Sequence, residues 1–246
     1  MTARVVLPHD ASLHGHLVDG VMRYIGVATA FWFVVMVVVL LVASIFHRAG
    51  RAQALYTHGD SRRHYLLAAL VAAAIFVGID MVTLVRSAGD LRRVFWNFPA
   101  DADSLRVEVT AQQWAWTFRY AGADGRFNTP DDIVTLNDLH VPVDRPVTLK
   151  LRSKDVVHSF YLPNFRAKID AVPGNETRLW FQARETGKFE IGCAQHCGVS
   201  HYKMRGELTV DSPDDYQRWA ENAAADSALR YDPVEAGLYD GWDWGT

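Results

Sequence analysis

The sequence predicts a membrane-anchored all-β protein, in which a transmembrane helical hairpin precedes a β-sandwich or barrel. Three observations lead to this fold class: two apolar runs near the N-terminus, an arginine-rich connection between them, and short strand-like segments in the second half. The chain has 246 residues, 50% hydrophobic and 22% charged, a composition typical of folded proteins. The net charge of −3 offers no basic field for a polyanion, so we expect no nucleic-acid partner.

Two apolar runs are long enough to cross a lipid bilayer. Residues 24–46 carry no charge, and at about 1.5 Å per residue they span the ~30 Å hydrocarbon core. Residues 65–85 form a second run, interrupted only by Asp80. A cleaved signal peptide is the alternative for the first run, but its apolar region is too long and follows a mostly polar segment. A buried core helix is the alternative for the second run. We expect two transmembrane helices.

The connection between the two runs predicts the orientation. Residues 47–64 contain four arginines and one acid, Asp60. By the positive-inside rule this connection is cytoplasmic, so both termini and the second half lie on the outer side. We therefore expect a multi-pass protein of a bacterial plasma membrane, with its outer domain in the periplasm.

The outer half has the rhythm of an all-β domain. Segments rich in Val, Thr, Phe, Trp and Leu alternate with clusters of Gly, Pro, Asn and Asp, as in a sandwich or barrel. After the last strand, Ser212 and Pro213 followed by two acids predict a short closing helix. The expected strands cover residues 105–111, 116–120, 147–151, 177–181, 189–191 and 207–210.

These patterns predict five segments along the chain. Residues 1–23 form an N-terminal outer segment, residues 24–85 the transmembrane hairpin, and residues 86–103 a linker. Residues 104–222 form the β domain with its closing helix, and residues 223–246 form a C-terminal tail.

The residues capable of metal chemistry are concentrated in residues 192–204 (GCAQHCGVSHYKM). The two cysteines of the chain, Cys193 and Cys197, lie there and are followed by His201 and Met204. Thiolate, imidazole and thioether groups select copper, zinc or iron–sulfur rather than magnesium or calcium. A disulfide is the alternative in an oxidising compartment, but closing so small a loop stabilises little and leaves the histidine and methionine unexplained.

A further nitrogen ligand has to come from another part of the chain. His158 is the best candidate, because it lies in a β segment just before a proline-containing loop, and His140 and His196 are its competitors. If Cys193 is set aside, the remaining donors are two histidines (His158 and His201), Cys197 and Met204. This is the ligand set found in blue-copper sites.

The second cysteine changes the expected metal count. The thiolates of Cys193 and Cys197 can bridge two copper ions, each with one histidine, while the thioether is a weak ligand to one copper and the Gln195 carbonyl binds the other. Such a site spreads one electron over two metals and favours fast one-electron transfer. The alternative is a structural zinc bound by both cysteines, His158 and His201.

Over nearly its whole length the chain resembles subunit II of the haem–copper cytochrome c oxidases. The resemblance implies a cupredoxin-like Greek-key β-barrel holding the binuclear copper centre CuA, with haem only in partner subunits. It is carried by the two helices and by four motifs, QWAWTFRY at residues 113–120, SKDVVHSF at 153–160, DAVPG at 170–174 and C-x3-C-x3-H-x2-M at 193–204.

The resemblance also implies the role of individual residues. Trp114 is similar to the surface tryptophan through which cytochrome c delivers its electron. Ordinary strand packing is the alternative for Trp114 and Trp116, since strand alternation places both on one face. The implied copper ligands are His158, Cys193, Gln195 through its backbone carbonyl, Cys197, His201 and Met204.

The chain departs from the family pattern in informative places. Many relatives have glutamate at the position of Gln195 and bind magnesium there. A neutral amide is a poorer ligand, so magnesium is not expected to bind in the usual way. Residues 62–67 (RRHYLL) lack the acid that mitochondrial-type relatives place at the mouth of a proton path, where His64 is a substitute. No C-x-x-C-H motif is present, so the cytochrome donor is expected to be a separate protein or part of another subunit.

The function that the resemblance implies is electron transfer in a respiratory terminal oxidase, an oxidoreductase complex. The copper centre accepts single electrons from a c-type cytochrome and passes them to haem in subunit I, which reduces oxygen to water. The expected partners are subunit I, other oxidase subunits, the cytochrome and the bilayer. The alternatives are a CuA subunit of a nitric oxide reductase and a membrane-anchored metal-binding module with no redox role.

Overall fold

A computed structural model describes residues 7–48 and 58–228 of the chain. The chain divides into two compact units. The helical unit covers Leu17–Arg93, and the β unit combines Met1–His16 with Val94–Thr246. Most of the expected C-terminal tail, residues 229–246, lies outside the described residues.

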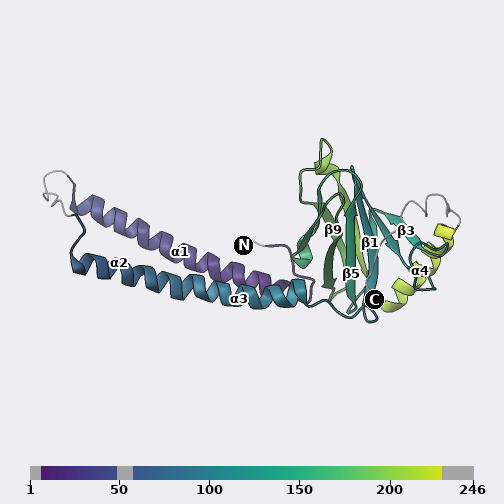
Figure 1. Cartoon of the computed structure of the whole chain (residues 1–246), viewed down its shortest axis with the longest axis horizontal. Coiled ribbons are helices and arrows are strands. Elements are labelled where there is room, and N and C mark those ends of the chain that lie inside the picture. Colours follow the sequence, from purple (N-terminus) through teal and green to yellow (C-terminus); the bar gives the residue numbers. More distant parts are fainter. Residues whose placement is uncertain (1–6, 49–57, 229–246) are drawn as a thin grey trace, which may run out of the picture. The chain divides into compact units, whose positions relative to one another are not determined.

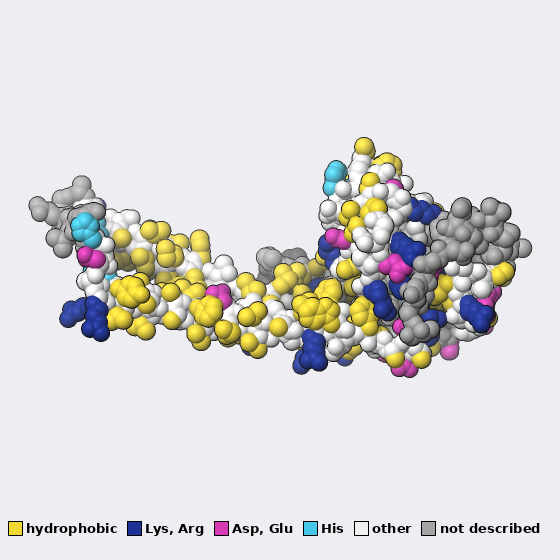
Figure 2. All heavy atoms as spheres, in the orientation of Figure 1, with side chains coloured by type: hydrophobic (Ala, Val, Ile, Leu, Met, Phe, Trp, Pro, Cys, Tyr) yellow, Lys and Arg dark blue, Asp and Glu magenta, His cyan; other side chains and the backbone are white. Residues whose placement is uncertain are grey.

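The first helix, α1 (Gly15–Phe46), begins earlier than its uncharged run. At its start the Ser12 hydroxyl accepts a hydrogen bond from the Gly15 amide at 2.7 Å, which satisfies one of the free amides of the first turn. None of the residues in its most apolar stretch is buried within the described structure. Figure 2 accordingly shows apolar side chains along the surface of the helical unit, as expected of a helix in lipid.

The second helix is continuous from Arg62 to Trp96 and is also apolar enough to cross a membrane. Part of the expected linker, residues 86–96, is therefore helical. The charged residues after residue 85 end the apolar run, but they do not end the helix, because arginine favours helix. The helix stops shortly before Pro99. Its parts are α2 (Arg62–Ile75), the π-helical η1 (Phe76–Met81), α3 (Val82–Leu91) and the π-helical η2 (Arg92–Trp96).

One side chain of α1 contacts the wide turn of the second helix. The Tyr24 hydroxyl donates to the Gly78 carbonyl within η1, and the Arg86 guanidinium lies over the Tyr24 ring at 5.1 Å from its centroid. A π turn leaves carbonyl groups without regular helical partners. The tyrosine satisfies one of them and ties the two helices together.

The β unit consists of two five-stranded sheets, with strand orders β3-β2-β1-β5-β8 and β4-β10-β9-β6-β7 (Figure 1). The pairs β1–β5 and β4–β10 are parallel, whereas the other pairs are antiparallel. The expected fold class, a helical hairpin followed by a cupredoxin-like β domain, is confirmed. The strands are β1 (Leu105–Gln112), β2 (Ala115–Tyr120), β3 (Ile133–Leu136), β4 (Asp138–Pro142), β5 (Pro146–Ser153), β6 (His158–Leu162), β7 (Ala167–Ala171), β8 (Thr177–Gln182), β9 (Gly187–Cys193) and β10 (Arg205–Asp211).

Four strands are absent from the expected list, although β6 was expected as the β segment that holds His158. β3 reads IVTL, residues that favour strand, but it is only four residues long and follows an acidic turn. β4 reads DLHVP and β7 reads AKIDA, so the local preference of these two for strand is weak. They form because their neighbours supply backbone partners, as β10 does for β4 and β6 for β7.

The core lies between the two sheets and contains side chains from both. Trp116 and Phe118 of β2 meet Phe160 of β6, with ring centroids 5.3 and 6.2 Å apart. All three rings are fully buried. Because packed aromatic rings contribute much of the free energy of core formation, these contacts hold β6, and with it the residue that begins β6, in a fixed place.

Two further segments close the β unit. The closing helix is confirmed as α4 (Pro213–Ala228) and continues beyond the expected end at residue 222. At its start the Ser212 hydroxyl accepts a hydrogen bond from the Asp215 amide at 3.2 Å. Trp219 of α4 stacks on His140 at 4.4 Å between centroids. At the other end of the chain, Ala11 exchanges backbone hydrogen bonds with Asn164 and Arg184, which joins the N-terminal segment to the sheet.

The interior position of β5, between β1 and β8, predicts a large effect of truncating one of its core side chains. Leu149 is fully buried, so we expect Leu149→Ala to lower the free energy of unfolding by about 2–5 kcal/mol. Leu136→Ala is the matched control, because Leu136 is 61% exposed and should change stability by less than ~0.5 kcal/mol. Urea denaturation of the full chain in detergent, followed by tryptophan fluorescence, measures both. Equal effects would contradict this placement of the core.

Candidate metal centre

Three loops meet at one end of the β unit and carry the expected site residues. They are the β1–β2 turn at residues 113–114, the β5–β6 loop at 154–157, and the β9–β10 loop at 194–204. His158 is the first residue of β6 and Cys193 the last of β9. Because these strands are antiparallel and Phe160 pairs with Cys193, the ends that carry the two side chains are adjacent.

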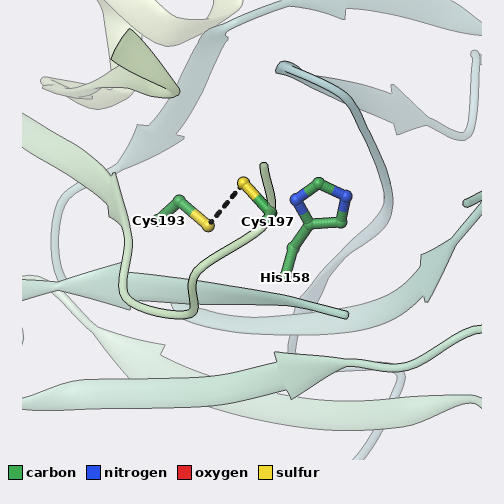
Figure 3. A group of neighbouring side chains, drawn as sticks. All are labelled: His158, Cys193 and Cys197. Carbon is green, nitrogen blue, oxygen red and sulfur yellow. Dashed lines mark hydrogen bonds between the residues drawn. The ribbon is translucent and has the colours of Figure 1, made fainter. Parts of the chain in front are cut away.

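The donor atoms of the site residues form one cluster. The ligand atoms of His158, Cys193 and Cys197 all lie within 4.8 Å of one another, as Figure 3 shows. The two sulfurs are 3.7 Å apart, and both cysteines are free thiols.

The remaining donors lie beside this cluster. Met204 Sδ lies 3.1 Å from His158 Nδ1 and 3.7 Å from Cys197 Sγ. His201 Nδ1 lies 3.5 Å from Cys197 Sγ, and the Gln195 carbonyl oxygen lies 3.3 Å from Cys193 Sγ. The six residues expected as metal ligands are therefore brought together.

The two competing histidines lie elsewhere. His140 is held between two carboxylates, with Nδ1 2.7 Å from Asp211 and Nε2 3.3 Å from Asp138. His196 is exposed, and its ring meets the edge of His201 at 5.6 Å between centroids. Neither belongs to the group of close ligand atoms formed by His158 and the cysteines.

A hydrogen-bond network that sequence analysis missed joins the three loops. The Asp155 carboxylate accepts from His158 Nε2 at 2.8 Å and from the Gln113 amide at 2.7 Å. The Gln113 side chain donates to the Cys197 carbonyl at 2.7 Å. The only available signals were the position of Asp155 three residues before the histidine and that of Gln113 beside the tryptophan. The network directs Nδ1 of His158 toward the sulfur atoms.

The network also sets the charge of Asp155. Burial alone raises the pKa of this carboxyl, but hydrogen bonds from His158 and from the amides of Gln113 and Val156 outweigh burial and leave the pKa below its ordinary value. An ionised Asp155 is therefore a stable acceptor for the imidazole N–H, as carboxylates beside metal-binding histidines commonly are.

The sulfur pair suits a soft metal cation. Burial, reinforced by the neighbouring Cys193, raises the pKa of the Cys197 thiol to about 12, because a buried thiolate lacks compensating charge. A bound cation supplies that charge and stabilises both thiolates. Two thiols, two imidazoles and a thioether form a soft donor set, so the residues present fit copper or zinc.

The alternative for Trp114, strand packing on one face with Trp116, is wrong. The β1–β2 turn contains Trp114, and β2 begins only at Ala115, so strand alternation does not extend back to Trp114. Trp116 is fully buried, whereas Trp114 is 37% exposed. A methyl group at Gly198 would lie 3.3 Å from two indole atoms of Trp114. The exposed indole thus lies against the residue that follows Cys197.

Comparisons with known proteins agree with this architecture. Residues 105–210 match the family model for the periplasmic domain of cytochrome c oxidase subunit II. The chain is 36% identical over 220 residues to the alternative cytochrome c oxidase subunit 2 of Bradyrhizobium diazoefficiens, covering 78% of this chain and 76% of that protein. It is 37% identical over 139 residues to cytochrome c oxidase subunit 2 of Thermostichus vulcanus, covering 56% and 38%.

Among solved structures, the periplasmic domain of subunit II of cytochrome oxidase (CoxB) of Bradyrhizobium japonicum is 30% identical. That comparison covers 52% of this chain and 96% of the other, with a TM-score of 0.45. The relatives place the β unit outside a bacterial membrane to which the helical unit anchors it, and they imply a copper centre. This chain belongs to the cytochrome c oxidase subunit 2 family and is a subunit of a haem–copper oxidase.

Proposed function

We propose that this chain receives electrons for a respiratory oxidase at a binuclear copper centre in its outer domain. The single observation that carries the proposal is the pair of sulfurs of Cys193 and Cys197, 3.7 Å apart, with the imidazoles of His158 and His201 beside it. One thiolate pair with two separate imidazoles suits two metal ions that share both sulfurs.

The distances suggest how the donors divide between the two ions. His158 and Met204 lie together, with Nδ1 and Sδ 3.1 Å apart, so we assign them to one copper. His201 and the Gln195 carbonyl are assigned to the other. The Gln195 side chain is exposed and neutral, and we assign it no magnesium. The proposed ligands are His158, Cys193, Gln195 through its carbonyl, Cys197, His201 and Met204.

The position of Met204 favours copper over zinc. In a structural zinc site the two cysteines and two histidines complete the tetrahedron, and the methionine is a core residue outside the donor set. Met204 is 1% exposed, but its sulfur contacts both the imidazole of His158 and the sulfur of Cys197. A thioether in this place suits copper, which accepts methionine as a weak ligand.

The protein keeps its ligands in place during electron transfer. Bound copper supplies one-electron chemistry with the electron shared over both ions, so that each bond changes little. Asp155 holds the His158 ring through Nε2, and Gln113 holds the carbonyl of Cys197. Because these contacts restrict the ligands before the electron arrives, little rearrangement has to accompany transfer.

Trp114 is the proposed point at which the electron enters the chain. Its indole is partly exposed to solvent and lies against Gly198, directly after Cys197. The same side chain therefore reaches both the surface and the loop that carries a copper ligand. A c-type cytochrome placed against it would transfer its electron over a short distance.

The proposed acceptor is haem in subunit I. Subunit I and other oxidase subunits are proposed to dock on the membrane hairpin. The names of the relatives support oxygen rather than nitric oxide as the final substrate. Four arginines in residues 47–64 support a cytoplasmic location for that loop in a bacterial plasma membrane. Both termini and the copper centre then face the periplasm.

Removing one bridging sulfur tests the binuclear site. We expect Cys193→Ser to bind at most one copper per chain, because a hydroxyl does not replace a bridging thiolate. His140→Gln is the matched control and should keep two, since His140 lies outside the cluster. Metal analysis after copper loading of the full chain gives both numbers. Two coppers in Cys193→Ser would contradict the bridging role.

Replacing the exposed tryptophan tests the path of the electron. We expect Trp114→Phe to slow oxidation of cytochrome c at least about tenfold, a barrier increase of ~1.4 kcal/mol, with the copper spectrum unchanged. Trp219→Phe, in α4, should leave the rate unchanged. Stopped-flow absorbance measures the rate. An unchanged rate in Trp114→Phe would assign Trp114 a packing role only.

A further inference from the structure

The buried ring of Trp116 lies against one of the proposed copper ligands. Its centroid is 6.0 Å from the centroid of the His158 ring, in an edge-to-face contact, and both side chains are fully buried. The same imidazole bonds to Asp155 through Nε2 and lies beside Met204 at Nδ1. The indole is therefore a third neighbour of this ligand, and its position restricts how the imidazole can turn.

The Trp116 ring depends on packing and on its own backbone for its orientation. Within the described residues, its buried indole N–H has no hydrogen-bond partner, although buried indoles usually find one. The ring packs on Phe160 at 5.3 Å between centroids. Because no polar contact fixes the indole, a shift of the β2 backbone at this residue would move the ring, and with it a neighbour of His158.

Both backbone polar groups of Trp116 are bound by one residue, Asn137. The Asn137 side-chain oxygen accepts a hydrogen bond from the Trp116 amide at 2.8 Å, and the Asn137 amide donates to the Trp116 carbonyl at 2.7 Å. Asn137 is the single residue between β3 and β4, which belong to different sheets. Its φ of 56° lies in the left-handed region, which asparagine adopts more readily than most residues.

The same asparagine contacts the strand that follows Met204. The Glu207 amide of β10 donates to the Asn137 carbonyl at 2.9 Å, and Met204 directly precedes β10. The approach is close, since a methyl group at Gly206 would lie 3.1 Å from the Asn137 carbonyl oxygen. Asn137 thus joins the strand that carries Trp116 to the strand that begins after the thioether ligand.

We propose that Asn137 is a positioning residue for His158 and Met204, the two ligands assigned to one copper. Through Trp116 it holds a neighbour of the imidazole in place, and through β10 it holds the backbone next to the thioether. The inference rests on the proposed function, which supplies the copper that the two ligands share. Residues that orient metal ligands from outside the donor set commonly change metal affinity, so loss of Asn137 should weaken this copper in particular.

Replacing Asn137 by glycine tests the role of its side chain. Glycine adopts a positive φ without strain, so the backbone bonds to Trp116 and Glu207 can persist while the side-chain acceptor is lost. In the copper-loaded full chain in detergent, we expect Asn137→Gly to make the sharing of the unpaired electron unequal, which changes the copper hyperfine splitting in the electron paramagnetic resonance spectrum. Copper should also pass to the chelator bathocuproine disulfonate, under ascorbate, at about tenfold lower chelator concentration.

Three further variants separate positioning from a general loss of stability. Asn137→Asp keeps an oxygen acceptor and tolerates positive φ, so it should keep the wild-type spectrum. Gly206→Ala displaces the Asn137 carbonyl and should change the spectrum as Asn137→Gly does. Asn128→Gly is the matched control, because Asn128 also has a positive φ, of 65°, and lies between β2 and β3, beyond the other end of β2. Its spectrum and its copper retention should be unchanged.

The outcomes distinguish this inference from the proposed function. An unchanged spectrum and unchanged copper retention in Asn137→Gly would overturn the inference. Equal changes in Asn137→Asp or in Asn128→Gly would also overturn it, because the side-chain oxygen of Asn137 would then not be the cause. In either case, two coppers that share one electron in the wild-type chain would leave the proposed function intact. A wild-type chain that binds a single copper would contradict the binuclear centre itself.

Discussion

The hydrogen bond from His158 to Asp155 is the interaction on which the arrangement of the site depends. The Asp155 carboxylate holds Nε2 of the imidazole, so that Nδ1 is directed toward the sulfurs. The same carboxylate accepts a hydrogen bond from the Gln113 amide, and the Gln113 side chain donates to the Cys197 carbonyl. One carboxylate thus ties together loops that lie more than 80 residues apart in sequence. A soft donor set assembled in this way is ready before any metal arrives, which lowers the cost of ordering the ligands.

One end of the β domain combines two properties, a rigid support for the metal ligands and a surface that a partner protein can reach. Packed rings of β2 and β6 fix the strand that begins with His158, while the loops above it expose apolar side chains. Buried donors, as His158, Cys197 and Met204 are, and exposed apolar loops are needed together in a protein that passes electrons between partners. The copper has to be shielded from water, and the donor has to come close. The membrane hairpin adds anchorage, and its exposed apolar surface is suited to lipid and to helices of other subunits.

Most of the architecture was predictable because its strongest signals are local. The uncharged run at residues 24–46 predicts a transmembrane helix, and the alternation of Val107 and Val109 predicts strand β1. β7 was missed because its pairing with β6, rather than its composition, makes it a strand. The clustering of Cys193, Cys197, His201 and Met204 was predictable from spacing, since these four side-chain donors lie within twelve residues. Asp155 and Gln113 were missed because their roles depend on contacts between distant loops. The packing alternative for Trp114 failed because strand alternation stops at a turn.

Copper stoichiometry together with electron paramagnetic resonance is the sharpest test of the binuclear site. The full chain would be loaded with copper in detergent, left oxidised and freed of unbound metal. We expect two coppers per chain that share one unpaired electron, since both thiolates bridge the ions. One copper with an ordinary four-line pattern, or bound zinc with no signal, would contradict it, because Cys193 would then not be a bridge.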